Sequence, residues 1–194
     1  MTRKLILLGG GGHCKSCIDV IEQSKQFQIV GILDTLEKVG QKVLAYDTIG
    51  TDEQIDELVA EECEFLVTVG QIRSPKVRLK LFAQLQASNA TIATVISPRA
   101  YVSHYAKIGA GTIVMHDALV NADAQIGQNC IINSKALIEH DVLIEDHCHI
   151  STAAVLNGGV TVKEGTFFGS NAVSKESVNT SKEAFIKAGS LFLG

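Results

Sequence analysis

The sequence predicts two different folds in series, a small Rossmann-like parallel α/β domain over residues 1–95 and a β-solenoid over residues 96–194. Three observations lead to this prediction. Residues 101–168 repeat with a period of six. Before the repeat, short apolar runs alternate with amphipathic segments, which is the order of strands and helices in an α/β domain. Four consecutive glycines follow the first apolar run, as in a nucleotide-binding strand, loop and helix unit.

Two places in each hexad carry the repeat, counted from Tyr101. The second place is apolar twelve times in succession, held by Val102, Ile108, Val114, Val120, Ile126, Ile132, Ile138, Ile144, Ile150, Leu156, Val162 and Phe168. The sixth place is small or compact throughout. Neither a helix nor a plain strand produces this spacing. Because three hexads make one triangular coil of 18 residues, we predict a left-handed parallel β-helix, in which each coil is stabilised by its neighbours.

The first domain should contain a parallel sheet of four or five strands. We expect strands at 4–8, 28–33, 43–49, 64–69 and 91–96, and helices at 13–23, 52–62 and 75–87. Thr51 and Gln54 have the spacing of a capping box before the second helix. The pair Ser97-Pro98 should end this domain. Residues 173–183 are polar, so we expect a loop or a distorted coil there.

Composition excludes several classes of function. The chain of 194 residues has a net charge of −4 and no basic run, so nucleic acid is not an expected partner. No segment is apolar enough for a membrane span, and the first residues are too short for a secretory signal, so we expect a cytoplasmic protein. Cys14 and Cys17 form one CxxC without a second pair of ligands, so we expect no metal.

Ligand-binding residues of the first domain should lie at the carboxyl ends of its strands, near Gly9 to His13, Asp34 and Gly70. Asp34 ends the second strand, where a carboxylate accepts hydrogen bonds from a ribose or a base edge. An aspartate that caps a turn is an equal alternative. Cys14 stands where the GxGxxG fingerprint requires its last glycine, so a dinucleotide such as NAD is not expected.

His140 is the sharpest catalytic candidate in the repeats, because Asp141 follows it. A carboxylate bonded to one ring nitrogen fixes the tautomer and makes the other nitrogen more basic. The alternative is a solvated histidine on a solenoid surface, which is how we interpret His104, His116 and His147. Residues 18 positions away should stack above and below His140, and these are Ala122 and Gly158. Both are small and leave space for a substrate.

Several motifs together resemble one family. Asn133-Ser134, IEHD, HIS, VLNGGV and FFGSNAV in the repeats, with GGGGH, ILD and VTVG before them, resemble the sialic acid O-acetyltransferase and bacillosamine N-acetyltransferase family of hexapeptide-repeat enzymes. The resemblance covers nearly the whole chain. It implies that His140 is the general base, which deprotonates a sugar amine or hydroxyl as that group attacks the thioester of acetyl-CoA. It further implies that Asp141 orients this base.

The resemblance also assigns residues to the two substrates. It places Asn133, His149, Gly158 and Gly169 near the acetyl-CoA co-substrate. It places the nucleotide or sugar beside His13, Gly11, Gly12, Asp34 and Gly70. It implies a homotrimer that binds the acetyl donor between neighbouring chains, with three sites.

We therefore expect an acetyltransferase that acts on the amino group of a UDP-4-amino sugar in bacterial surface glycan synthesis. O-acetylation of a sialic-acid-like sugar is the alternative, because VGQIRSPKVR is similar to that branch and Thr35 stands where the N-acetylating branch often has a second acidic residue. A non-catalytic protein that binds sugar nucleotides is a third possibility. The zinc carbonic anhydrases of the same solenoid need two histidines five residues apart, and the repeats contain no such pair.

Overall fold

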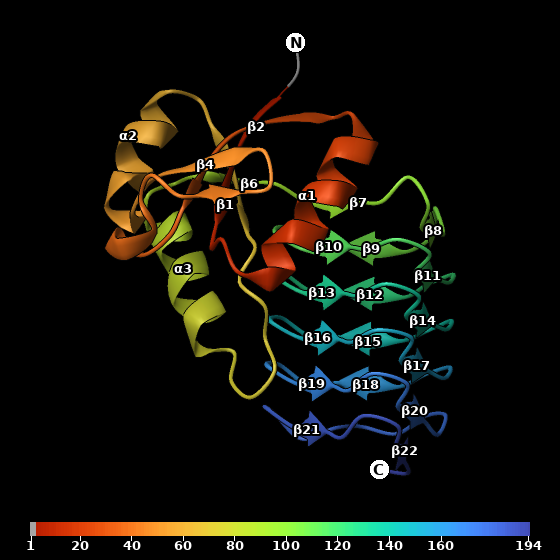
Figure 1. The fold of residues 1–194 in the computed structure, drawn as a ribbon. Coiled ribbons are helices and arrows are strands. Elements are labelled where there is room, and N and C mark those ends of the chain that lie inside the picture. Colours follow the sequence, from red (N-terminus) through yellow and green to blue (C-terminus); the bar gives the residue numbers. More distant parts are fainter. Residues whose placement is uncertain (1–2) are drawn as a thin grey trace. The chain divides into compact units, whose positions relative to one another are not determined.

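The computed structural model describes residues 3–194, and the chain divides into two compact units (Figure 1). The first unit runs up to Gly70 and resumes over Lys76–Ala93. The second unit comprises Gln71–Pro75 and Thr94–Gly194. The sequence prediction placed the boundary after residue 95, whereas in the structure it follows Ala93. The segment Gln71–Pro75, which interrupts the first unit in the sequence, also belongs to the solenoid unit.

The first unit is a mainly parallel sheet, whose strand order over the described residues is β3-β4-β2-β1-β5-β6. Its central strand is completely buried from Leu5 to Leu8, which explains its uninterrupted apolar sequence. The strands are β1 (Arg3–Leu8), β2 (Phe27–Leu33), β3 (Lys42–Val43), β4 (Tyr46–Gly50), β5 (Glu64–Val67) and β6 (Thr91–Ile92). The helical segments are α1 (Gly12–Ser24), η1 (Leu36–Lys38), η2 (Asp52–Gln54), α2 (Ile55–Ala60) and α3 (Lys76–Ala87).

Three predicted elements of this unit differ from the structure. The expected strand at 43–49 is an antiparallel hairpin, β3 and β4, which reverses at Leu44 with a φ of 54°. The expected helix at 52–62 begins as the 3₁₀ turn η2, although its capping box is present, with Thr51 N–H donating to Gln54 Oε1 at 3.2 Å. The expected strand at 91–96 divides between the units, with β6 in the first sheet and β7 (Val95–Ile96) in the solenoid.

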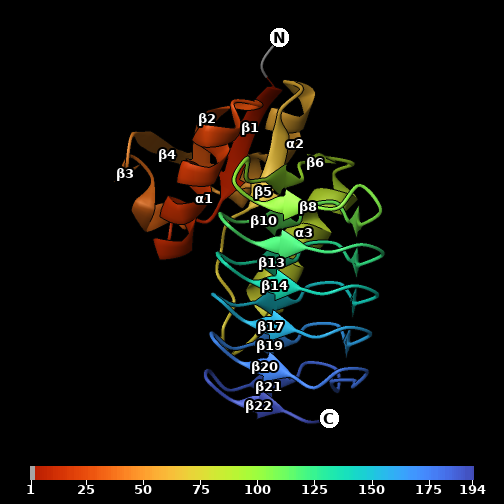
Figure 2. The ribbon, with the colours of Figure 1, turned by 90° about the vertical axis from the view of Figure 1, so that its right-hand side faces the viewer.

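The second unit is a left-handed β-helix with three flat faces, seen from the side in Figure 2. Each of its strands has two residues. The first face contains β7 (Val95–Ile96), β10 (Ile113–Val114), β13 (Ile131–Ile132), β16 (His149–Ile150), β19 (Phe167–Phe168) and β21 (Phe185–Ile186). The second face contains β8 (Tyr101–Val102), β11 (Leu119–Val120), β14 (Leu137–Ile138), β17 (Val155–Leu156), β20 (Val173–Ser174) and β22 (Leu191–Phe192). The third face contains β9 (Lys107–Ile108), β12 (Gln125–Ile126), β15 (Leu143–Ile144) and β18 (Thr161–Val162).

The period of six residues builds the core of this unit. Strands pair in parallel with an offset of 18 residues, as in Ile113 with Ile131. Second-place and sixth-place side chains fill the interior, where Ile132, Cys130 and Cys148 are fully buried. The coil continues through residues 173–183, because Ser174 and Thr180 are buried at second places and Asn179 bridges to Thr161. Ser97-Pro98 lies in the first turn of the solenoid, after β7, rather than before it.

The fifth place of each hexad shapes the turns. From Gly111 to Gly189 it has a positive φ in every hexad, and many of these positions hold glycine, asparagine or aspartate. Those residues adopt the left-handed conformation at low cost. Asp141, with a φ of 61°, is one of them, so its identity suits the turn as well as any chemistry. None of the helices described in residues 3–194 is both long and apolar enough to cross a bilayer.

Candidate functional site

His140 and Asp141 occupy the turn between β14 and β15, at the corner where the second and third faces meet. The Nδ1 atom of His140 lies 2.7 Å from Oδ2 of Asp141. A carboxylate only accepts hydrogen bonds, so Nδ1 carries the proton and Nε2 keeps its lone pair. The hydrogen bond with Asp141, aided by the nearby charge of Glu139, raises the pKa of His140 above its ordinary value. Both side chains of the pair are more than half exposed, at 63% and 60%.

Gly158 stacks on His140, as the 18-residue period predicts. A Cβ atom added to Gly158 would lie 2.7 Å from Cε1 and 2.8 Å from Nε2 of the imidazole. The N–H group of the next residue, Gly159, donates to the His140 carbonyl at 3.1 Å. The imidazole therefore rests on backbone, with its basic nitrogen beside a residue that has no side chain.

Replacing Gly158 with alanine should displace the imidazole, because the added methyl group would overlap Nε2. We expect acetyl transfer to slow by about 100-fold, the effect of a 1 Å misplacement at a reacting centre. Steady-state kinetics with acetyl-CoA and an acceptor sugar measures this loss. Glu176→Ala, at the exposed equivalent position of the next coil, is the control and should retain full activity; equal activity of both variants would contradict the role that the resemblance implies for His140.

Asn133 and His149 form a separate pair on the solenoid. The N–H of Ser134 donates to Asn133 Oδ1 at 2.8 Å, so the Asn133 amide turns its Nδ2 toward Nε2 of His149, 3.1 Å away. On the other side of the ring, His149 Nδ1 donates to the carbonyl oxygen of Gln71. His149 is buried, with 6% of its surface exposed. These partners fix His149 as the neutral tautomer that carries its proton on Nδ1.

Within one chain, the structure does not bring this pair beside His140. Asn133 lies at the corner between the first and second faces, and His140 lies at the next corner of the same coil. Gly169 shares the corner of Asn133, two coils further along. An added Cβ at Gly169 would lie 2.5 Å from the nitrogen of Ala188, so close packing of the coils already requires glycine there.

In the first unit, Asp34 closes the glycine loop. Its Oδ2 accepts the N–H of Gly10 at 2.6 Å, and its Oδ1 accepts the N–H of Thr35 at 2.7 Å. Lys38 forms an ion pair with the same carboxylate at 3.0 Å. Burial alone would raise the pKa of Asp34, but these hydrogen bonds and the Lys38 charge outweigh it and hold the pKa below its usual value. The structure therefore favours the turn-capping alternative for this carboxylate.

Replacing Asp34 with alanine should destabilise the first unit, because two backbone N–H groups would lose a charged acceptor. We expect the free energy of unfolding to fall by about 2 kcal/mol, measured by urea denaturation with the helical circular dichroism signal, since the helices lie in the first unit. Because the folded pKa is lowered, this contribution is complete above the unfolded pKa of about 3.9 and is lost as the pH falls through the folded pKa. Asp47→Ala, an exposed carboxylate of the same unit, should change stability far less; equal losses would refute the capping role.

The remaining predicted residues of this unit lie at the start of α1. Gly11 is the N-cap residue and Gly12 begins the helix, and an added Cβ would meet nothing within 4 Å at either position. Gly70 lies against His13, because its added Cβ would be 3.3 Å from the Cβ of His13. The loop thus brings His13 and Gly70 together, and it leaves Gly11 and Gly12 accessible.

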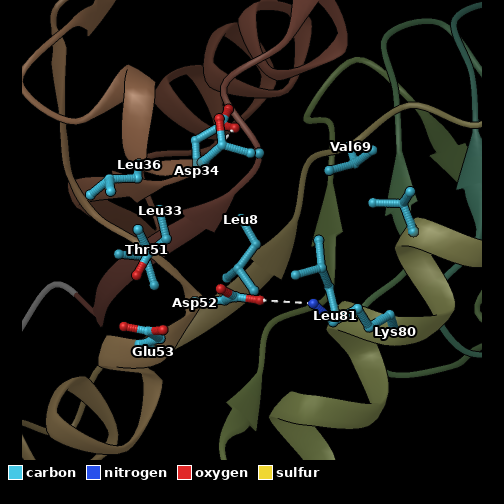
Figure 3. Close-up of a pocket in the computed structure, with 13 residues that line it drawn as sticks. Leu8, Leu33, Asp34, Leu36, Thr51, Asp52, Glu53, Val69, Lys80 and Leu81 are labelled. Carbon is cyan, nitrogen blue, oxygen red and sulfur yellow. Dashed lines mark hydrogen bonds and ion pairs between the residues drawn. The ribbon is translucent and has the colours of Figure 1, made fainter.

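A pocket of about 440 Å³ opens at the carboxyl ends of β1, β2 and β5 (Figure 3). Asp34 is the predicted site residue that lines it. The others in its wall, which the sequence analysis did not select, include Leu36, Thr51, Asp52, Glu53, Val77 and Lys80. Lys80 Nζ lies 3.4 Å from an oxygen of Asp52. Thr51 could have been found from its place after β4, because ligands of open α/β sheets bind outside the carboxyl ends of the strands.

The cysteines pack in the cores of the two units. Cys14 and Cys17 are fully buried on the inner side of α1, and burial raises the pKa of the Cys14 thiol to about 11. A thiol with a raised pKa is a poor nucleophile and a poor metal ligand. Within residues 3–194, no three histidine, cysteine or acidic side chains gather in a way that could hold a metal ion.

Two family descriptions match the chain in the order of its two units. Residues 4–85 match the PglD N-terminal domain, and residues 105–140 match the bacterial transferase hexapeptide (six repeats). No match was found among curated protein sequences.

Solved structures resemble the chain over nearly its full length. The acetyltransferase domain of PglB from Neisseria gonorrhoeae has a TM-score of 0.92 and 27% identity, covering 99% of this chain and 92% of that one. The same domain in complex with acetyl coenzyme A has a TM-score of 0.89 and 28% identity, covering 97% of this chain and 90% of that one. PerB from Caulobacter crescentus, in complex with CoA and GDP-perosamine, has a TM-score of 0.91 and 28% identity, covering 98% of this chain and 88% of that one.

These matches confirm the predicted fold class, an α/β domain followed by a left-handed β-helix. They join a PglD-type domain to hexapeptide repeats, as the motifs in both halves of the sequence predicted. The chain thus combines a PglD-type N-terminal domain with hexapeptide repeats, and over nearly its full length it is similar to solved sugar acetyltransferases.

Proposed function

We propose that the chain transfers the acetyl group of acetyl-CoA to the amino group of a nucleotide-activated 4-amino sugar, with His140 as the general base. The observation that carries this proposal is the His140–Asp141 pair, in which the Nδ1–H···Oδ2 bond of 2.7 Å leaves Nε2 free to accept a proton. The imidazole packs on the backbone of Gly158, and 63% of the His140 side chain remains exposed in the single chain. A base of raised pKa that is accessible to substrate is what attack by an amine requires.

The reaction needs no covalent enzyme intermediate. The sugar amine attacks the thioester carbon, a C–N bond forms, and the C–S bond to CoA breaks. His140 Nε2 takes the proton that the amine loses and then returns it to the thiolate of CoA, while Asp141 stabilises the imidazolium between these steps. In the turn around Gly158 the N–H groups of Asn157 and Gly159 already donate to Ser174 Oγ and to the His140 carbonyl, so the N–H of Gly158 is the proposed donor to the developing oxyanion. The buried cysteines have no role in this sequence.

The similar proteins support this reaction class. The Neisseria gonorrhoeae domain is an acetyltransferase solved with acetyl coenzyme A, and the Caulobacter crescentus protein is a perosamine N-acetyltransferase solved with CoA and GDP-perosamine. Two further structures of the Caulobacter protein replace one histidine with asparagine or alanine. We propose that the acceptor of this chain is a UDP-linked amino sugar, as the sequence resemblance implies. We also propose that the chain acts in the cytoplasm, in surface glycan synthesis.

The pocket of the first unit is the proposed place for the nucleotide. It lies at the carboxyl ends of the strands, next to the central strand β1 where the chain order of the sheet reverses. Exposed Leu36 and Val77 offer apolar contact for a base, and the ammonium of Lys80 offers a charge for phosphate. In this proposal Asp34 supports the loop by accepting its backbone N–H groups, rather than accepting hydrogen bonds from the nucleotide.

We also propose a homotrimer, because the second face of the solenoid is an apolar stripe. Its outward residues occupy the first place of each hexad, and all are apolar: Tyr101, Leu119, Leu137, Val155, Val173 and Leu191. None of the six is fully buried within the single chain, and Tyr101 and Leu191 are exposed at 58% and 65%. The outward residues of the third face include Lys107, Gln125 and Thr161. An exposed apolar stripe of this kind is typical of a subunit interface.

This interface would complete the active site. The apolar second face is bounded on one side by the corner of Asn133 and Gly169 and on the other by the corner of His140 and Gly158. If three copies pack through this face, the His140 corner of one chain faces the Asn133 corner of the next. The proposal thus accounts for predicted site residues that lie at two different corners of one chain.

One experiment tests the function directly. The purified protein is incubated with acetyl-CoA and, separately, UDP-4-amino sugars, GDP-perosamine and sialic acids, and the release of free thiol is measured. We expect thiol release with an amino sugar, and mass spectrometry should show one added acetyl group. Release with a sialic acid alone would establish O-acetylation instead, and no release with any acceptor would favour a sugar-nucleotide-binding protein without activity.

A further inference from the structure

The segment 71–75, which we call the strap, belongs to the solenoid unit although it lies between β5 and α3 in the sequence. Gln71 holds one end of it. The Nε2 atom of Gln71 donates to the carbonyl oxygens of His147 at 3.0 Å and Gly165 at 3.2 Å. At the other end, buried Pro75 packs against Gly165. The strap is therefore fixed to two consecutive coils of the solenoid.

The backbone of Gln71 has a second role. Its carbonyl oxygen accepts the Nδ1–H of His149 at 2.5 Å. The side-chain bonds to His147 and Gly165 fix the position of this carbonyl, because they belong to the same residue. A carbonyl can only accept a hydrogen bond, so the strap forces the proton of His149 onto Nδ1.

The consequence reaches Asn133. With its proton on Nδ1, His149 can only accept a hydrogen bond at Nε2, and it accepts one from Nδ2 of Asn133 at 3.1 Å. The same amide accepts the N–H of Ser134 through Oδ1. Both amide atoms are thus fixed, and the second N–H of Nδ2 is the donor that Asn133 can still offer to a substrate at its corner.

The burial of Gln71 strengthens this interpretation. Gln71 is 2% exposed, and within the described residues its Oε1 atom is buried without a hydrogen-bond partner. An unpaired buried acceptor destabilises the folded state. An apolar residue of the same size would avoid that destabilisation. The presence of glutamine at position 71 is therefore explained by its two donor bonds and by the carbonyl that these bonds position.

We propose that Gln71 is a positioning residue for acetyl transfer: the strap sets the tautomer of His149, and His149 in turn aims the amide of Asn133 into the active site. Gln71 touches neither substrate in this arrangement. The inference rests on the proposed function for its effect on rate, whereas the tautomer itself can be observed without any substrate.

The test combines nitrogen NMR with kinetics on the full chain. In protein labelled with ¹⁵N-histidine, the His149 signals, assigned by their loss in His149→Gln, should show protonated Nδ1 and unprotonated Nε2. Gln71→Met keeps the volume but removes both donor bonds, so we expect a mixture of His149 tautomers. We also expect kcat to fall by about 10- to 100-fold, the usual effect of losing a residue that orients a site group, with the KM for the sugar unchanged.

Two matched variants complete the design. Arg73→Ala changes an exposed residue of the same strap and should leave both the tautomer and kcat as in the wild type. Asn133→Asp replaces the amide donor with an acceptor, so His149 should become protonated at both nitrogens. The nitrogen NMR signals of His149 show this change even if Gln71→Met folds poorly.

The outcomes separate the inference from the function on which it rests. An unchanged His149 tautomer in folded Gln71→Met would overturn the inference, and so would a mixed tautomer in Gln71→Met with wild-type kcat. If Gln71→Met does not fold, a His149 that is not protonated at both nitrogens in Asn133→Asp would overturn the relay to Asn133. If the wild-type chain acetylates no acceptor but the tautomers shift as expected, the proposed function fails and the hydrogen-bond relay is confirmed.

Discussion

Replacing His140 with glutamine should slow acetyl transfer by about 10²- to 10⁴-fold, the usual contribution of a general base. Glutamine retains a polar side chain of similar size but cannot take the proton of the attacking amine. Because the side chain of His140 is 63% exposed in the single chain, the solenoid should remain folded and its thermal unfolding unchanged. Thiol release in the presence of acetyl-CoA and the acceptor sugar measures the effect.

The chain provides a matched control for this variant. His116 is also followed by an aspartate at the same places of its hexad, but its Nδ1 bonds Ser97 Oγ at 2.7 Å and Asp117 forms an ion pair with Arg99 at 2.7 Å. His116→Gln should therefore keep wild-type turnover. If His116→Gln lost activity and His140→Gln kept it, His116 rather than His140 would be the base.

The pH dependence of kcat/KM reports on the same group. His140 must be neutral to act as a base, and its pKa is raised, first by the hydrogen bond to Asp141. Activity should therefore rise as the pH increases through a value above about 6.5, the ordinary pKa of histidine. In Asp141→Asn the main cause of the shift is removed, so this inflection should move to lower pH.

The second large effect is expected from Leu137→Asp. Leu137 lies in the middle of the apolar second face, and a carboxylate buried unpaired in a subunit interface costs about 3–5 kcal/mol. In the proposed trimer the two corners of the site come from different chains, so we expect this variant to be monomeric and to lose acetyl transfer. Sedimentation or light scattering gives the mass, and circular dichroism checks that each chain is still folded.

Leu143→Asp is the matched control, since Leu143 is a leucine at the same hexad place on the third face, 39% exposed. It should leave the assembly intact. A stronger test mixes two inactive variants, His140→Gln and Asn133→Ala, in one cell. Mixed trimers contain sites with both residues intact only if neighbouring chains share a site, so recovered activity is expected. No recovery, or a monomeric wild-type chain, would refute the shared site.

The sequence predicted the solenoid more accurately than the first domain. The period of six reflects which side chains face the interior, and the same places face inward in every coil. The twelve apolar second-place residues were therefore correctly predicted to lie in the solenoid core. The strand at 91–96 was wrong as a single element, because its apolar pattern satisfies two sheets in turn. The hairpin at β3 and β4 was missed because its reversal uses Leu44, a residue that gives no turn signal.

The site was only partly predictable for a similar reason. The pair His140-Asp141 and the stacking of Gly158 follow from adjacency and from the period. The pocket residues Thr51 and Lys80 carry no binding motif, because Thr51 was noted only as a helix cap and Lys80 lies within α3; both line the pocket in the folded unit. The role of Gln71 was also hidden, because its partners lie 76 to 94 residues away in the sequence.

The sequence by itself determined the β-helix, its register and the outward placement of His140, because a six-residue period assigns every side chain to a face, a corner or the core. The aspartate that follows each histidine does not separate His140 from His116; the family resemblance selected His140, and the tertiary structure supplied the physical difference, which is the partner of each ring. The tertiary structure also decided that Asp34 supports a loop and that a distant strap fixes His149. These outcomes depend on contacts between segments far apart in the chain, which local pattern does not encode.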